Sequence, residues 1–292
     1  MPLTLSRRTL IRLAAAGGGV VFASRLGIRP GVAATEEFYF VQLSDIHWGF
    51  QDATVNPDPR ATLEKAIAAI NAAPHMPDFI VFTGDLTHMT KDAQERRRRM
   101  GEVRAMLGTL KVSRQFYLPG EHDAALDRGA AFQELFGPLH QAFDHKGLHF
   151  VALDNTSDPH GLLGDAQLAW LAADLKGRDP DLPVVVLAHR PLFALKPDWD
   201  WFTRDGDKAI ELLTPFKKVT VFYGHIHQQN THRTGAITHI AARSAMYPLP
   251  APGSAPKKAP LPWNAGAGDH GIGWREIDAE KDGLQVDDRP TA

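Results

Sequence analysis

The amino-acid sequence predicts an α/β protein, and three observations support this prediction. Short apolar runs alternate with helical patterns beyond residue 35. Ionisable residues directly follow several of these runs, as they do at the carboxyl ends of strands in α/β sheets. The 292 residues, 43% of them hydrophobic and none of them cysteine, are enough for one large domain or two small ones. This composition excludes a disordered chain, a collagen-like structure and a disulfide framework.

Apolar runs rich in Val, Ile, Phe and Leu have the composition of buried strands. They are residues 37–44, 78–83, 114–119, 149–154, 183–188 and 218–223. Helical patterns lie between these runs, and their alternation with the strands predicts an α/β architecture. The expected helices are residues 60–73, 92–107, 129–136, 165–175 and 207–213.

The pattern changes beyond residue 235. Residues 236–241 and 271–278 are expected to be strands, and a turn at residues 280–283 leads into a last short strand. Residues 248–268 are dense in Pro, Ala and Gly and are expected to form an irregular loop or crossover. No internal repeat and no charged linker divides residues 35–292, so we expect a single domain there.

The first 34 residues have the organisation of an export signal. They contain five arginines and no acid, an apolar stretch over residues 10–22, and the A-x-A-like cleavage site Val32-Ala33-Ala34. The segment Ser6-Arg7-Arg8-Thr9-Leu10-Ile11 resembles a twin-arginine signal. We therefore expect residues 1–34 to be a signal peptide that the twin-arginine export machinery recognises. The mature protein is then expected to be periplasmic or secreted.

An uncleaved amphipathic anchor is the alternative for this segment. Its apolar stretch is weakly hydrophobic, interrupted by arginines and too short to span a bilayer. We therefore expect no stable membrane insertion.

The rest of the chain is acidic, with 27 basic and 34 acidic residues and a net charge of −7. Because nucleic-acid binding needs a basic footprint, no nucleic-acid polymer is expected as a partner. The four arginines at residues 96–99 lie inside a helical pattern and point in different directions. A solvated helix face is favoured for this run over a phosphate-binding site.

Candidate functional residues gather where the expected strands end. Asp45 and His47 follow the first strand, and Asp85 follows the second. The third strand runs into Glu121-His122-Asp123, the fifth into His189-Arg190, and the sixth into His225 and His227. Because loops at the carboxyl ends of strands converge on one crevice, these side chains are expected to meet.

Imidazoles and carboxylates without a thiol suit Mn, Fe or Zn. A single Gly-Asp pair or a single histidine is more often structural, but the ordered set is strong support for a metal site. The ligand candidates are too many for one ion and suit two. They are Asp45, His47, Asp85, Glu121, His189, His225 and His227.

These motifs resemble those of the calcineurin-like metallophosphoesterases over about residues 37–230. Leu153-Asp154, Gly161-Leu162-Leu163 and the segment 167–171 resemble the bacterial cyclic-nucleotide phosphodiesterase branch. The resemblance implies two packed mixed β-sheets flanked by helices, with two metal ions at the strand ends. The single domain expected for residues 35–292 is accordingly expected to be catalytic.

The resemblance implies a ligand set and a reaction. One ion is held by Asp45, His47, Asp85 and His227, and the other by Asp85, Glu121, His189 and His225. His122 then lies beside the substrate. The ions, divalent or mixed-valence Fe, Mn or Zn, clamp the phosphoryl oxygens and convert bound water into hydroxide. The expected substrate is a small phosphate ester, with a phosphodiester favoured over a monoester.

Two positions depart from the family pattern. Glu121 stands where the family usually has Asn, and an anionic ligand weakens the ion as a Lewis acid and favours a harder ion such as ferric iron. His88 stands where many relatives have an Asp that orients the catalytic histidine, and Asp123 is a candidate for that role. The candidate catalytic residues are therefore His122, Asp123 and His88.

Three interpretations of these departures are open. A phosphoesterase that compensates locally is favoured over a metal-binding or redox protein without phosphoesterase turnover, and both are favoured over an inert remnant. The Pro-rich segment 248–262 leaves an interaction module as a further class. No P-loop motif and no Gly-x-Ser-x-Gly motif is present, which removes the cues for a nucleotide switch and a serine hydrolase.

The remaining candidates are substrate contacts. Trp199, Trp201 and Arg204 lie in a nonperiodic loop after His189, where the tryptophans either stack on a substrate or pin the loop to the core. Arg190 either contacts a phosphate or pairs with an acid. His160 is a weaker candidate in another loop.

Overall fold

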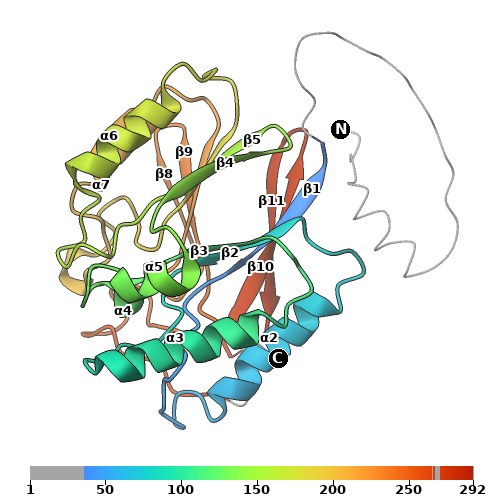
Figure 1. Ribbon diagram of the computed structural model, residues 1–292, viewed down its shortest axis with the longest axis vertical. Helices are drawn as coiled ribbons and strands as arrows, with labels where there is room; N and C mark the ends of the chain where they lie inside the picture. Colours follow the sequence, from blue (N-terminus) through green and yellow to red (C-terminus); the bar gives the residue numbers. More distant parts are fainter. Residues whose placement is uncertain (1–35, 265, 267–269, 292) are drawn as a thin grey trace, which may run out of the picture.

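The strand β1 (Phe38–Leu43) lies in the middle of a five-stranded sheet in the computed structural model, which describes residues 36–264, 266 and 270–291. The order is β11 (Gly283–Pro290), β10 (Gly273–Glu280), β1, β2 (Phe79–Thr83) and β3 (Gln115–Leu118). The strands β1, β2 and β3 are parallel, whereas β10 is antiparallel to both of its neighbours, β1 and β11 (Figure 1). The carboxyl ends of the three parallel strands therefore meet at one edge.

A second, six-stranded sheet contains most of the remaining strands. Its order is β4 (Gln141–His145), β5 (Leu148–Ala152), β6 (Val184–Leu187), β7 (Val219–Tyr223), β9 (Ile237–Ala241) and β8 (Asn230–Thr234). The four inner strands are parallel, and the edge strands β4 and β8 are antiparallel to their neighbours. Both sheets are thus mixed.

The two sheets pack face to face through aromatic and aliphatic side chains. On β1, Phe40 faces the other sheet, where its ring lies 5.5 Å from that of Phe150, while Tyr39 and Val41 face the helices. This alternation is the period of two expected of a strand that is buried on both faces. It explains why β1 is a continuous apolar run.

Helices cover the outer face of each sheet (Figure 1). The first sheet is covered by α2 (Pro59–Asn71), α3 (Ala93–Leu107) and α5 (Ala130–Phe136). The second is covered by α6 (Gly164–Leu175) and α7 (Gly206–Leu213). Helix, sheet, sheet and helix therefore form four layers, which confirms the predicted fold class.

Each predicted element corresponds to an observed one, and the ends of the predicted ranges differ from the observed ends by at most two residues. The strands β4 and β8 were not predicted. Both are edge strands with polar, half-exposed or exposed side chains, so they lack the apolar run of an inner strand. No regular element occurs in the described part of residues 248–268, as predicted.

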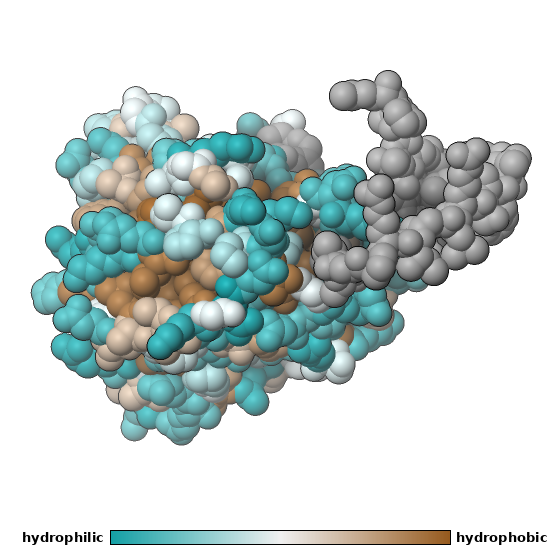
Figure 2. Space-filling model, turned by 90° about the horizontal axis from the view of Figure 1, so that it is seen from above, coloured by the Kyte–Doolittle hydropathy of each residue, from teal (hydrophilic) through white to brown (hydrophobic). Residues whose placement is uncertain are grey.

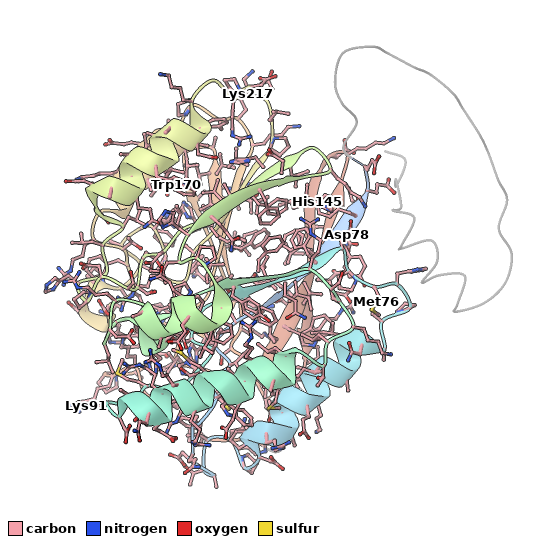
Figure 3. All side chains as sticks on the ribbon, viewed as in Figure 1. Met76, Asp78, Lys91, His145, Trp170 and Lys217 are labelled. Atoms are coloured by element: carbon pink, nitrogen blue, oxygen red, sulfur yellow. The ribbon has the colours of Figure 1, made fainter. Side chains whose placement is uncertain are left out.

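Polar side chains also tie parts of the fold together. His145 of β4 lies beside Asp78, which precedes β2 (Figure 3), and its Nε2 is 2.8 Å from the carboxylate Oδ2. The arginines of the run 96–99 all pair with carboxylates on α3 or near α5, and Arg96 is buried while the other three lie toward the surface. These pairs support the helix-face interpretation of that run.

Within the described ranges, no helix has the length and apolar character needed to cross a membrane. The face in Figure 2 is mainly hydrophilic, with apolar residues visible between polar ones. The predicted signal peptide, residues 1–34, lies outside the described residues.

Candidate metal centre

The candidate ligands lie in loops with an unusual backbone. Asp45, His47, Asp85, His225 and His227 all have positive φ angles, between 46° and 66°. They make up five of the nine non-glycine residues with positive φ in the described chain. Such conformations are costly and cluster at functional sites, where the surrounding structure enforces them.

Glycines allow these loops to approach one another. A Cβ atom on Gly120 would lie 2.0 Å from Oδ1 of Asp85, and one on Gly224 would lie 2.5 Å from Oδ2 of Asp45. Both distances are far below van der Waals contact, so any larger residue at either position would displace a candidate ligand.

The first group of ligand atoms comes from the loops after β1 and β7. Oδ1 of Asp45 lies 3.2 Å from Nε2 of His227, and that nitrogen lies 3.1 Å from Nε2 of His47. All three side chains are buried. Two imidazole nitrogens and a carboxylate oxygen therefore converge without a nonpolar side chain between them, as a metal ion requires.

The second group comes from the start of the short helix α4 (Glu121–Ala124), which follows β3, and from the loops after β6 and β7. The Glu121 carboxylate places Oε2 3.0 Å from Nε2 of His189 and Oε1 3.0 Å from Nδ1 of His225. Although Oε2 of Glu121 and Nε2 of His189 lie only 3.0 Å apart, these buried atoms form no hydrogen bond of good geometry with each other or with another described residue. Buried polar atoms without partners are costly, so this donor set fits a metal ion.

Asp85 lies between the two groups. Its Oδ2 is 3.5 Å from Nε2 of His47 on one side and 3.5 Å from Nε2 of His189 on the other. Its Oδ1 accepts a hydrogen bond from the backbone N–H of His122 at 2.9 Å. One carboxylate oxygen is thus free to face both groups while the other fixes the loop after β3.

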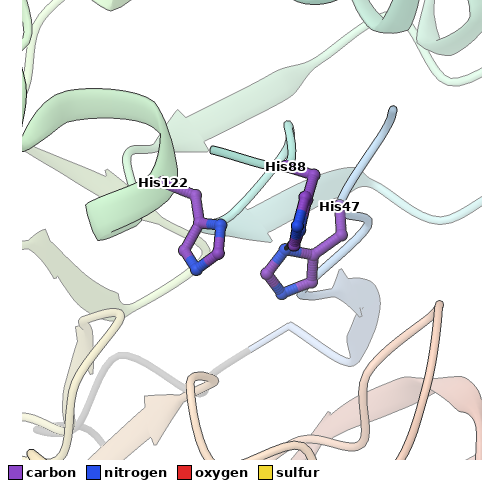
Figure 4. A group of neighbouring side chains, drawn as sticks. All are labelled: His47, His88 and His122. Carbon is purple, nitrogen blue, oxygen red and sulfur yellow. Dashed lines mark hydrogen bonds between the residues drawn. The ribbon is translucent and has the colours of Figure 1, made fainter. Parts of the chain in front are cut away.

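Each histidine among the candidate ligands directs its second ring nitrogen to a fixed partner. The partners are backbone carbonyls for three of them: Thr83 for His189, Tyr247 for His227 and Asp200 for His225, at 2.7, 2.8 and 3.0 Å. His47 differs, because its Nδ1 lies 3.4 Å from Nδ1 of His88 (Figure 4). Such outer contacts set the tautomer and the ring orientation of metal-binding histidines.

The electrostatics of the second group follow from burial and charge. Burial opposes ionisation of Glu121, but His225, Arg190 and His189 together hold the pKa of its carboxyl well below its usual value. Burial likewise lowers the pKa of His189, but Asp85 and Glu121 outweigh it and raise that pKa well above its usual value. The carboxylates therefore attract positive charge to this position.

His122 lies at the edge of the site, with its side chain 22% exposed. Its Nε2 is 3.9 Å from Oδ2 of Asp85, and its Nδ1 accepts a hydrogen bond from the backbone N–H of Met89 at 2.9 Å. The neutral ring therefore carries its proton on Nε2 and can donate it toward a substrate.

Asp123 does not take the orienting role for which it was a candidate. The Asp123 carboxylate accepts hydrogen bonds from the backbone N–H groups of Leu86, Thr87 and Gly120, at 2.8 to 3.0 Å. Asp123 thus braces the loop after β2 against the loop after β3 rather than orienting His122. His88 faces His47, and burial lowers its pKa to about 4.

The two tryptophans of the loop after His189 take the second of the two orientations that the sequence left open. Trp199 and Trp201 are 6% and 0% exposed and pack against Tyr223 and Ile226, so they pin their loop to the core. The short 3₁₀ helix η1 (Pro197–Trp199) leads into this anchor. Sequence reasoning left both orientations open, and only the burial of the rings decides between them.

The other substrate candidates have protein partners. Arg190 is buried and pairs with Asp200, its Nη1 lying 2.5 Å from Oδ2. Arg204 is exposed and donates from Nε to the backbone carbonyl of His160 at 2.7 Å. These contacts favour acid pairing for Arg190 and connect the loops of Arg204 and His160.

Sequence reasoning missed Asp200, Tyr247 and Met89. Their contacts with the candidate histidines are made by backbone groups, which any residue type supplies, so no residue pattern marks these contacts. Tyr247 also stacks its ring on that of His47, with centroids 5.0 Å apart.

The two-sheet sandwich and the polar groups at its strand ends are those of a metal-dependent phosphoric ester hydrolase. The model of the Calcineurin-like phosphoesterase family matches residues 38–229, and the chain belongs to this family.

Similar proteins include named phosphodiesterases. The probable cyclic nucleotide phosphodiesterase of Rhodococcus erythropolis is 26% identical over 237 residues, covering 76% of this chain and 75% of that protein. The 3',5'-cyclic adenosine monophosphate phosphodiesterase CpdA of Escherichia coli is 27% identical over 198 residues, covering 65% of this chain and 69% of that protein. A dimetal phosphatase from Danio rerio shares the fold, with a TM-score of 0.64 at 14% identity, covering 87% of this chain and 96% of that chain.

Proposed function

We propose that this protein hydrolyses a small phosphodiester at a dinuclear metal centre. The observation that carries the proposal is Oδ2 of Asp85, which lies 3.5 Å from both His47 and His189 and so between two separate groups of ligand atoms. Asp45, His47 and His227 would hold one ion with Asp85. Glu121, His189 and His225 would hold the other with the same carboxylate.

Bound ions of this kind supply Lewis-acid stabilisation of phosphoryl charge and a nucleophile at neutral pH. The protein contributes the surrounding groups. Asp123 holds the two ligand loops together, and the strained backbone at Asp45 and Asp85 fixes their carboxylates. His122, partly exposed and protonated on Nε2, donates a hydrogen bond to the phosphoryl group and so stabilises the charge that develops there.

A diester is favoured because the similar proteins include named cyclic-nucleotide phosphodiesterases. The test is hydrolysis of bis(p-nitrophenyl) phosphate, p-nitrophenyl phosphate and cyclic AMP by protein whose metal content has been measured. We expect turnover of the diesters that chelation abolishes and Mn²⁺ or Fe²⁺ restores. Two bound ions without turnover of any ester would contradict the proposal and leave a metal-binding or redox protein on this scaffold.

We further propose that residues 1–34 direct export by the twin-arginine pathway and that residues 35–292 form a single catalytic domain in the periplasm or outside the cell. Support comes from the paired residues Arg7 and Arg8 and the small residues before Thr35. Cell fractionation tests this: replacing both arginines by lysine should retain the full-length chain in the cytoplasm. Unchanged export of that variant would exclude the twin-arginine route.

A further inference from the structure

Glu121 contacts a buried cation as well as the two histidines of its group. Its Oε2 lies 3.7 Å from Nε of Arg190, whose side chain is 8% exposed. That Nε has no hydrogen-bond partner among the described residues. A permanent positive charge therefore lies directly behind the carboxylate that departs from the family pattern.

Asp200 holds Arg190 in this position. Its carboxylate Oδ2 lies 2.5 Å from Nη1 of Arg190, and its backbone carbonyl accepts from the same Nη1 at 3.3 Å. That carbonyl also accepts a hydrogen bond from Nε2 of His225 at 3.0 Å. Asp200 therefore positions both the candidate ligand His225 and Arg190, the cation beside the candidate ligand Glu121. The buried rings of Trp199 and Trp201 on either side of Asp200 fix its loop.

The charges around the second group explain why such a cation is needed. Glu121 adds a negative charge to a site that already contains Asp85, and this additional charge by itself favours a more highly charged metal ion. The positive charge of Arg190 offsets the negative charge of Glu121, because the two groups are close together and buried, where screening by solvent is weak. The Asp200 carboxylate, on the far side of Arg190, is 48% exposed and hence better screened.

We propose that Arg190, held by Asp200, is a specificity-determining residue that offsets the charge of Glu121 and keeps the second metal position selective for a divalent ion. This inference rests on the proposed dinuclear centre. It replaces the expectation of a ferric ion, which was based on the charge of Glu121 alone and did not include Arg190. It also accounts for Arg190 without a substrate contact, because two of its donor nitrogens face carboxylates.

A double-mutant cycle on the metal-free, full-length chain tests the proposal, with binding of Mn²⁺ measured by competition with a fluorescent chelator. Glu121→Asn leaves Arg190 uncompensated beside the ion, so the second Mn²⁺ should bind at least about tenfold more weakly. Adding Arg190→Gln to this variant should restore most of that loss. Additive losses would show that Arg190 only holds the structure together, and would overturn the proposal.

A second measurement addresses selectivity with Ga³⁺ as a redox-inert trivalent probe, buffered by nitrilotriacetate. Arg190→Gln alone should shift the second position toward Ga³⁺ over Mn²⁺ by about tenfold. Arg190→Lys keeps the charge and should keep the preference of the wild type; a shift as large as that of Arg190→Gln would overturn the proposal. Arg178→Gln removes another Arg–Asp pair, between the segment after α6 and Asp144 of β4, and is the matched control.

These measurements distinguish an error in the proposed dinuclear centre from an error in the role of Arg190. A wild-type chain that binds fewer than two ions contradicts the dinuclear centre and this inference with it. A chain that binds two ions, but shows no coupling between Glu121 and Arg190, contradicts this inference alone.

Discussion

The backbone N–H of Met89 donates a hydrogen bond to Nδ1 of His122 at 2.9 Å. A backbone donor can only be paired with an acceptor nitrogen, so the neutral ring carries its proton on Nε2. In relatives with an aspartate at position 88, the resemblance assigns the orientation of this histidine to a carboxylate. In this chain a peptide group orients it, and the substitution by His88 does not leave His122 without a partner.

The first prediction concerns His122. His122→Ala should lower kcat for bis(p-nitrophenyl) phosphate by a factor of about 10² to 10³, since it removes the hydrogen-bond donor beside the substrate. Metal content should stay at the wild-type level, because His122 does not belong to either ligand group as proposed. His140→Ala, which changes a ring that packs on Trp170, is the control and should leave kcat unchanged. An unaltered kcat in His122→Ala would remove this residue from the mechanism.

The second prediction concerns His88, whose Nδ1 faces Nδ1 of His47 at 3.4 Å. His88→Ala removes the partner that sets the tautomer of His47, and the affinity for the first ion should fall by about 10- to 100-fold. His88→Asn supplies an acceptor oxygen of similar reach and should recover part of the loss. Competition titration with a chelator measures both variants, and equal affinities in wild type and His88→Ala would contradict the role.

The third prediction concerns Trp201, which is 0% exposed. Trp201→Ala should lower the free energy of unfolding by about 3 to 5 kcal/mol, because it leaves a large cavity in the core. Trp201→Phe fills more of the space and should cost less. Urea unfolding measures both variants. If Trp201→Ala instead raised KM for the ester and left the stability unchanged, that result would support a substrate-stacking role for Trp201.

The sequence was sufficient for most of the fold because the inner strands are buried on both faces. Their continuous apolar runs, as in β1 and β6, are hard to mistake for loops. Edge strands such as β8 need no apolar run, because their side chains are largely open to solvent. A polar segment can form the backbone hydrogen bonds of such a strand as well as an apolar one.

The residues of the candidate site could likewise be predicted only in part. Asp45, Asp85 and His189 could be placed from sequence because they follow buried strands whose ends meet at one edge. Their outer contacts could not, because carbonyls such as that of Asp200 carry no side-chain signature. The direction of Arg190 could not be predicted either, since one guanidinium suits a phosphate and a carboxylate equally well.

The last prediction concerns stability at acid pH and a histidine away from the metal centre. His239 of β9 is 0% exposed, neither of its ring nitrogens has a hydrogen-bond partner within the described chain, and its ring packs against those of Phe193 and His232.

Burial, and to a lesser degree the neighbouring His232, lowers the pKa of His239 from 6.5 to about 4. Between these two values the unfolded chain binds a proton that the folded chain excludes, so stability falls as the pH falls from 6.5 to 4. The loss amounts to about 3 kcal/mol.

His239→Phe keeps a ring in the core without a titrating group, and its free energy of unfolding should decline less steeply over this range. Urea unfolding of metal-free protein at several pH values measures the slope, and His75→Gln, an exposed position, is the control. A slope in His239→Phe equal to that of the wild type would show that His239 does not cause the acid sensitivity.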